Sequence, residues 1–349
     1  MKKKVAICGF GGQGAWHYRT ISANEVAEVV GVYDVKASRM DYAKEQGLVA
    51  FDSYEALLAS DCEIVVVATP NDVHKDLCIK ALEAGKHVVC EKPVTLSVAE
   101  FDAITEAAER CGRLFTVHQN RRWDTDFLAV KSLIESGKIG KPLYVASTVH
   151  GSRGIPGDWR QEKRYGGGMV YDWGVHMIDQ MLLLIDSPIK SVYCMETHYT
   201  NSEVDDGYKL YLEFACGTVG YSEVGTYNFI SMPRFYAQFE QGTAQITGWH
   251  DPVLVRECRN WGEGEVHPVL TASGITKTMA PRSQASVDEY TVDQPKSDVH
   301  DFYRNLCLAI DGKAEKLIRD EQVRRVLQVI DAAFLSAKEH RPVTFAQGL

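Results

Sequence analysis

The first 120 residues alternate between short apolar runs and longer stretches in which apolar positions recur at helical spacing. The runs at Val29–Val32 and Ile64–Val67 are continuously apolar, which is typical of parallel strands covered by helices on both faces. Strands are predicted at Val5–Cys8, Val29–Tyr33, Ile64–Ala68, His87–Cys90 and Leu114–His118. Helices are predicted at Gln13–Ala23, Ser38–Gln46, Tyr54–Leu58, Val73–Ala84 and Val98–Cys111. This alternation predicts a doubly wound α/β fold around a parallel sheet.

The pattern changes after Arg122, where period-two alternation becomes dominant. Strands are predicted at Leu143–His150, Lys209–Phe214, Thr218–Val224, Phe235–Glu240 and Ala244–Thr247. Helices are predicted at Thr125–Ser136, Asp172–Ile185, Val299–Asp311 and Asp320–His340. A glycine-rich loop is expected at Gly151–Gly168, and residues 260–295 are polar and irregular, which predicts a long loop over a site or an interface. We therefore expect a second, α+β domain with an open, largely antiparallel sheet, and place the domains at residues 1–121 and 122–349.

Composition narrows the possible partners. The 349 residues carry 38 Lys and Arg against 47 Asp and Glu, a net charge of −9, which argues against nucleic acid and anionic membranes as partners. No apolar run of about 18 residues is present, so no membrane span is expected. Nine dispersed cysteines without a Cys-x-x-Cys pair fit reduced thiols and a cytoplasmic location.

A glycine motif follows the first predicted strand and opens the first helix. Gly9-Phe10-Gly11-Gly12-Gln13-Gly14 matches G-x-G-x-x-G in the context that a dinucleotide site requires. Its backbone N–H groups and the helix dipole would hold a pyrophosphate, and Gly9, Gly11, Gly12, Gln13 and Gly14 are the expected contacts. Asp34 ends the second strand, where an acid accepts the ribose hydroxyls and repels a 2′-phosphate. NAD is therefore expected over NADP, although Lys36 and Arg39 lie close by.

Two further strand ends carry polar residues, and strand ends line the ligand crevice of such sheets. Thr69, Asn71 and His74 follow the third strand and are candidate contacts of the nicotinamide ribose. Glu91-Lys92-Pro93 follows the fourth strand, where Lys92 can bond a substrate hydroxyl and stabilise developing negative charge. The alternatives are helix capping for the first group and a surface lysine for the second.

A second cluster lies in the helix predicted over Asp172–Ile185. Asp172, His176 and Asp179 are spaced i, i+4, i+7 and would share one helix face. A histidine beside a carboxylate can act as an oriented general base, and the same triplet could bind a divalent metal. No fourth ligand cluster is evident, so we expect no metal. The remaining alternative is a capped helix with a satisfied histidine.

Candidate pocket walls come from two other segments. Arg122 lies in the segment His118–Trp123 that joins the two halves, and Trp159-Arg160 lies in the glycine-rich loop. Aromatic faces and guanidinium donors suit sugars and polyols, so Arg122, Trp159 and Arg160 are expected to contact substrate. A hinge and packing role is the alternative.

These motifs, together with Ala68-Thr69-Pro70-Asn71 and Gly166-Gly167-Gly168, occur in an order that closely resembles the Gfo/Idh/MocA oxidoreductase family over nearly the whole chain. The segment His118–Trp123 is most similar to scyllo-inositol and related polyol or sugar dehydrogenases. The resemblance implies an NAD-binding Rossmann domain, and a homodimer or homotetramer formed through the second sheet. It also implies roles: Lys92 near the reacting hydroxyl, His176 as base, and Asp172 binding or polarising substrate.

The resulting expectation is an NAD-dependent dehydrogenase of a cyclic polyol, sugar or glycoside. His176, helped by Lys92, would take the hydroxyl proton while a hydride leaves for C4 of the nicotinamide. An alternative implied by the same family is a glycoside-cleaving enzyme that retains NAD and acts by transient C3 oxidation and elimination. A cofactor-sensing regulator is a further alternative, but such proteins would be expected to lose Lys92 or His176.

Overall fold

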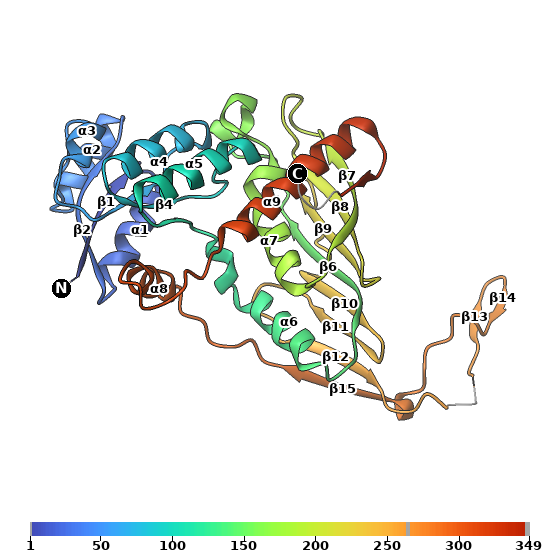
Figure 1. The fold of residues 1–349 in the computed structure, drawn as a ribbon. Coiled ribbons are helices and arrows are strands. Elements are labelled where there is room, and N and C mark those ends of the chain that lie inside the picture. Colours follow the sequence, from blue (N-terminus) through green and yellow to red (C-terminus); the bar gives the residue numbers. More distant parts are fainter. Residues whose placement is uncertain (1, 263–265, 346–349) are drawn as a thin grey trace.

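A computed structural model describes residues 2–262 and 266–345, and it shows two sheets side by side (Figure 1). The first sheet has five parallel strands in the order β2-β1-β3-β4-β5. Their bounds are β1 Lys3–Cys8, β2 Ala27–Tyr33, β3 Ile64–Val67, β4 His87–Cys90 and β5 Phe115–Val117. The predicted α/β fold of the N-terminal half is confirmed, and all five predicted strands are present with small differences at their ends.

Helices cover both faces of this sheet, as its continuously apolar strands predict. They are α1 Gly12–Ser22, α2 Ala37–Glu45, α3 Tyr54–Leu58, α4 His74–Glu83 and α5 Val98–Cys111. The Ser97 side chain caps α5 by accepting from the Glu100 N–H, and Gly112 ends it in the left-handed conformation. Every strand therefore ends in a short loop at one edge of the sheet, where a ligand crevice is expected.

The second sheet has nine strands in the order β15-β12-β11-β10-β6-β9-β8-β7-β16. Only β6 and β9 pair in parallel among its named strand pairs, so the predicted open, largely antiparallel sheet is confirmed. Its strands are β6 Pro142–His150, β7 Ile189–Thr197, β8 Gly207–Phe214, β9 Val219–Gly225, β10 Phe235–Phe239, β11 Gly242–Ile246, β12 Val253–Cys258, β15 Val287–Val292 and β16 Val343–Thr344.

Three helices pack on one face of this sheet: α6 Thr125–Ser136, α7 Val175–Leu184 and α9 Asp320–Glu339 (Figure 1). The burial of β8 alternates accordingly: Tyr208, Leu210 and Leu212 are buried toward the helices, whereas Tyr211 points away and is 38% exposed. The opposite face carries a row of tyrosines across neighbouring strands, formed by Tyr193, Tyr211, Tyr221, Tyr144 and Tyr236.

The chain returns to the first domain near its end. Helix α8, Asp301–Ile310, buries Phe302, Tyr303 and Leu306 in the core of the parallel sheet, and Ile318 joins them. A boundary at residue 121 therefore separates the strands of the two sheets, but α8 and Ile318, which follow that boundary, belong to the hydrophobic core of the first sheet.

The segment predicted as an irregular loop between residues 260 and 295 contains three strands in its described parts, residues 260–262 and 266–295, and residues 263–265 lie outside the described residues. The hairpin of β13 Val269–Thr271 and β14 Gly274–Thr276 projects away from the body, and β15 extends the large sheet by pairing with β12 (Figure 1). The loop prediction is wrong at β15 because an edge strand can be polar and still pair through its backbone. In residues 2–262 and 266–345, no helix combines the length and the apolar character that crossing a membrane requires.

Candidate active site

The glycine-rich turn between β1 and α1 contains two kinds of glycine. A Cβ at Gly9 would lie 2.5 Å from the Ala68 carbonyl oxygen, and one at Gly14 would lie 1.9 Å from the carbonyl oxygen of Gly9. Both positions exclude a side chain, and Gly9 also has a φ of +92°. A Cβ at Gly11 or Gly12 would meet no described heavy atom within 4 Å. These two glycines leave open space at the N-terminus of α1, where backbone N–H groups and the helix dipole favour phosphate.

A cavity of about 990 Å³ lies at the carboxyl ends of the parallel strands. The first domain contributes the glycine-rich turn, Asp34, the segment 68–73 after β3, and Glu91-Lys92 after β4. The second domain contributes Asp158, Trp159, Arg160, Tyr165 and Asp172. A cavity of this size and position fits a dinucleotide with a substrate at the domain junction.

Asp34 follows β2 and faces the glycine-rich turn. One carboxylate oxygen accepts the Phe10 backbone N–H at 2.7 Å, and the other accepts the Lys36 backbone N–H at 2.8 Å. The remaining lone pairs can accept ribose hydroxyls. Lys36, Arg39 and Lys80 line the same cavity and would favour a 2′-phosphate, so the residues fit NAD(P) without separating the two cofactors.

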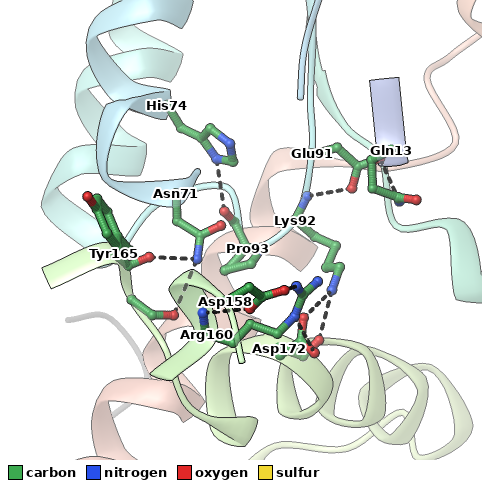
Figure 2. A network of polar contacts seen from close by, with 11 residues as sticks. Gln13, Asn71, His74, Glu91, Lys92, Pro93, Asp158, Arg160, Tyr165 and Asp172 are labelled. Atoms are coloured by element: carbon green, nitrogen blue, oxygen red, sulfur yellow. Dashed lines mark hydrogen bonds and ion pairs between the residues drawn. The ribbon is translucent and has the colours of Figure 1, made fainter. Parts of the chain in front are cut away.

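The loop after β3 connects the two domains. Thr69 and Asn71 line the cavity. Asn71 Nδ2 also donates to the carbonyl oxygens of Tyr165 at 3.1 Å and Gly166 at 3.3 Å (Figure 2). Asn71 therefore fastens the glycine-rich loop of the second domain to the edge of the cofactor cavity.

His74 has a different place from the one expected for it. Its ring is fully buried, with Nε2 2.9 Å from the Thr69 carbonyl oxygen and Nδ1 3.1 Å from that of Pro93. It does not line the cavity. His74 ties the loops after β3 and β4 together, and we do not carry it forward as a cofactor contact.

Lys92 reaches across the domain junction toward the second domain (Figure 2). Its Nζ donates to the Asp172 carbonyl oxygen at 2.8 Å and lies 3.3 Å from Asp172 Oδ1. Asp172 Oδ2 lies 3.1 Å from Arg160 Nε, and Arg160 pairs with Asp158 at 2.9 Å. Burial raises the pKa of the Asp172 carboxyl, but the charges of Lys92 and Arg160 outweigh this and hold that pKa below its ordinary value. Asp172 is therefore ionised at neutral pH.

Asp172 lies in a π-helical turn, Val170–Gly174, rather than in the predicted α-helix, which begins at Val175. The buried Asp205 carboxylate accepts the backbone N–H groups of Met169 at 2.8 Å and Val170 at 2.9 Å, and so fixes the start of this turn. A π turn contains an extra residue, which shifts the phase of every later side chain. The prediction of one continuous helical face is therefore wrong.

Asp179 is separated from the other two residues of the predicted triplet by its own ion pair. Its carboxylate accepts Arg122 Nε at 2.8 Å and Arg122 Nη2 at 2.6 Å, and Arg122 Nη1 bonds Gln322 at 2.9 Å. Arg122 does not line the cavity. It joins the interdomain segment to α7 and α9, a structural role that differs from the expected contact with substrate.

His176 lies one turn beyond Asp172, at the start of α7, and is 4% exposed. Its Nδ1 is buried without a hydrogen-bond partner among the described residues. Burial lowers the pKa of the imidazole well below its ordinary value, and the positive charges of Lys92 and Arg121 lower it further. His176 is therefore neutral at pH 7 and can accept a proton.

Sequence reasoning missed an aromatic and basic group beside His176. The Arg121 guanidinium lies 4.1 Å from the Trp173 ring centroid and 5.6 Å from that of Trp249. The two tryptophan rings are 6.0 Å apart, and Trp173 is 6.2 Å from the His176 ring. Arg121 and Arg122 are adjacent and chemically identical, so the sequence carries no signal that assigns the first to this group and the second to Asp179. Trp249 comes from the loop after β11, and no motif marks it.

Comparisons with known proteins agree with this geometry. Residues 3–119 match the oxidoreductase family with an NAD-binding Rossmann fold, and residues 127–245 match the GFO/IDH/MocA C-terminal domain. A structure titled as an NAD-binding protein from Listeria innocua is 42% identical, with a TM-score of 0.95 over 98% of this chain and 99% of that one.

Curated relatives extend the comparison. The NADP-dependent scyllo-inositol 2-dehydrogenase IolW of Bacillus subtilis is 27% identical over 97% of this chain and 95% of its own length. The oxidoreductase C115.03 of Schizosaccharomyces pombe is 39% identical over 48% of this chain, and the alignment spans 47% of that protein. The chain thus spans about half the length of some of the relatives it matches. Because both domains match in order, the chain belongs to the Gfo/Idh/MocA oxidoreductase family.

Proposed function

We propose that this protein is an NAD-dependent dehydrogenase that oxidises a secondary hydroxyl of a cyclic polyol, sugar or glycoside. One observation carries the proposal: the cofactor cavity ends at Lys92, which bonds ionised Asp172, and neutral His176 follows one turn later. This combines a positive donor for an oxyanion at the end of the cavity with an uncharged base in the next helical turn, a base that is 4% exposed and does not itself line the cavity.

The residues divide the chemistry between them. When bound, the nicotinamide supplies the redox step by accepting a hydride from the substrate carbon. His176 takes the hydroxyl proton, which its neutral imidazole can do at pH 7. Lys92 donates a hydrogen bond to the same oxygen and stabilises the negative charge that develops there. Asp172 holds the Lys92 ammonium in place and offers its carboxylate to a neighbouring hydroxyl.

The charge arrangement favours an uncharged substrate. Asp172 and Asp158 compensate Lys92 and Arg160 along the row at the cavity end. Trp159 lines the same cavity, with its ring centroid 4.6 Å from the Arg160 guanidinium. A polyol or sugar offers hydroxyls to these groups and C–H faces to the aromatic rings, and the name of the Bacillus subtilis relative supports this class.

We propose NAD rather than NADP because Asp34 carries a carboxylate at the end of β2, beside the glycine-rich turn, and an acid at that position repels a 2′-phosphate. We also propose that two or four copies associate through the tyrosine row on the uncovered face of the second sheet, in a reducing compartment. The nine cysteines are all unpaired, which agrees with such a compartment.

The alternative, a glycoside-cleaving enzyme that retains its cofactor, is favoured by one observation. Asn71 fastens residues 165 and 166 to the edge of the cofactor cavity, and a fixed wall at that edge would slow exchange of the dinucleotide. The dehydrogenase and the cleaving enzyme use the same lysine and histidine, so a measurement must separate them.

The deciding experiment follows absorbance at 340 nm with purified protein, NAD or NADP, and a panel of inositols, aldoses and glucosides. Substrate-dependent NADH formation supports the dehydrogenase and identifies its substrate class. Loss of glucosides without net NADH formation supports the cleaving enzyme. Absence of both reactions across the panel contradicts the proposal.

A further inference from the structure

The side chain of Glu91 is a buried carboxylate at the wall of the cofactor cavity, 4% exposed. Its Oε1 accepts His17 Nε2 and His118 Nδ1, both at 2.8 Å, and Gln13 Nε2 at 3.3 Å. Its Oε2 accepts the backbone N–H of Lys92 at 3.2 Å. Four donors therefore surround one negative charge, as a buried carboxylate requires.

These donors come from separate parts of the fold. Gln13 and His17 lie one turn apart on α1, the helix whose N-terminus faces the phosphate site. His118 directly follows β5, and Lys92 follows β4. Glu91 bonds both to α1 and to the backbone of Lys92 at the end of β4, so its position couples the dinucleotide-binding helix to the proposed catalytic lysine.

The tautomer of His17 is determined by a hydrogen bond with Tyr303. Tyr303 on α8 has its hydroxyl 2.5 Å from His17 Nδ1, and both side chains are fully buried. When the hydroxyl donates to Nδ1, the imidazole proton must be on Nε2, which faces Glu91. His118 Nε2 has no hydrogen-bond partner among the described residues, and the His118 ring lies among aromatic rings. The tautomer with the proton on Nδ1 is therefore favoured, because that N–H donates to Glu91.

We propose that His17 and His118 are positioning residues that hold the Glu91 carboxylate against the cavity wall and fix the distance between α1 and Lys92. The proposal rests on the proposed function for the role of Lys92, but the binding of the dinucleotide tests it separately. Without either donor, the carboxylate turns toward water in the cavity, where it repels the phosphates of the cofactor.

The direction of one titration agrees with this arrangement. Burial raises the pKa of the Glu91 carboxyl, but the two histidines outweigh this effect and hold that pKa well below its ordinary value. The His17, Glu91 and His118 atoms also lie within 4.8 Å of one another, a spacing that could hold a metal ion. Donation of hydrogen bonds to Glu91 predicts that amide substitutions of the histidines preserve NADH binding. Metal binding predicts a stoichiometric metal ion in the purified protein.

The experiment compares variants that remove a donor with variants that keep it. His17→Leu and His118→Leu remove the N–H, whereas His17→Gln places an amide N–H near the lost Nε2 and His118→Asn places one near the lost Nδ1. The probe is NADH, titrated by its fluorescence. We expect the leucine variants to raise the NADH Kd about tenfold, and the amide variants to stay within about threefold of the parent. Tyr303→Phe keeps the ring volume and is expected to raise the Kd about threefold, because His17 can then change tautomer.

Turnover gives a second measurement, with myo-inositol as the trial substrate. The leucine variants should lower kcat about tenfold with KM for myo-inositol unchanged, because neither histidine lines the cavity that holds the substrate. Leucine variants that bind NADH like the parent would overturn the proposal, as would folded amide variants that bind no better than the leucine ones. One equivalent of a transition metal in the purified protein would overturn it in favour of a metal site. If the parent oxidises no polyol but the NADH series behaves as expected, the proposed function fails and this proposal stands.

Discussion

Replacing Lys92 by methionine tests the proposed chemistry most directly. Methionine keeps the unbranched apolar stem of the side chain and removes the ammonium group. In the parent, Nζ bonds the Asp172 carbonyl oxygen at 2.8 Å and lies 3.3 Å from Oδ1, and the two side chains are only 13% and 14% exposed. The donor therefore acts in a region largely screened from water, where a hydrogen bond to a developing oxyanion is strong.

The expected loss follows from that role. Removing one donor to a developing oxyanion costs about 3 kcal/mol in the transition state, which corresponds to about a hundredfold to a thousandfold in kcat. Asp172 keeps its second partner, because Arg160 Nε remains 3.1 Å from Oδ2. The methionine variant should therefore fold, and its NADH Kd should stay within about threefold of the parent.

The assay combines NADH formation at 340 nm with NADH titration by fluorescence. Lys92→Arg is the matched control, because it keeps the positive charge but presents a planar, permanently protonated group. We expect the arginine variant to keep part of the parental kcat and the methionine variant to show the full loss. A methionine variant that keeps more than about a tenth of the parental kcat would refute the assignment of Lys92.

Three other outcomes are expected. Burial and the charges of Lys92 and Arg121 lower the pKa of His176, so its neutral base form persists as the pH falls. The pH profile of kcat/KM for oxidation should therefore show no acid limb near the ordinary imidazole pKa of about 6.5. An acid limb at that pH in the parent that is absent in His176→Gln would contradict this. Asp34→Ala should raise the KM for NAD about tenfold and narrow the preference over NADP, while Asp34→Asn, which keeps one acceptor oxygen, should bind NAD better than the alanine variant; equal cofactor kinetics in all three proteins would exclude the ribose assignment. Tyr211→Asp should shift the protein toward monomer in light scattering after size exclusion, because it places a charge in the tyrosine row; an unchanged mass would place any oligomer contact elsewhere.

The parts of the proposed site that depend on local rules can be located from the sequence. Gly9 to Gly14 and Asp34 could be assigned because a strand, a tight turn and a helix N-terminus are encoded by neighbouring residues. Thr69, Asn71 and Lys92 could be expected at the site because the ends of parallel strands meet at one edge of the sheet, and these three residues line one cavity. Each of these inferences needs only the order of the elements.

Two residues expected from the sequence as ligand contacts are instead engaged by segments distant along the chain. His74 has the position of a cofactor contact, but its ring is fully buried and both ring nitrogens lie beside backbone carbonyl groups rather than at the cavity. Arg122 has the chemistry of a substrate contact, but Asp179, 57 positions later, takes its guanidinium. A polar side chain that the sequence suggests as a ligand contact can instead form its hydrogen bonds with another part of the protein. Only the three-dimensional position of that partner decides between the two roles.

The π turn before α7 shows how such a distant contact decides the geometry of the catalytic group itself. Hydrophobic spacing predicts an ordinary helix from Asp172 onward, because π turns are rare and this spacing contains no signal for the extra residue. The turn is fixed from outside by Asp205, whose carboxylate bonds two backbone N–H groups at its start, and burial raises the pKa of that carboxyl to about 7. The same turn leaves the Asp172 carbonyl oxygen facing Lys92, which bonds it at 2.8 Å. Lys92 is therefore held by both the backbone carbonyl group and the carboxylate of a residue inside this irregular turn, so the turn contributes to the position of the lysine.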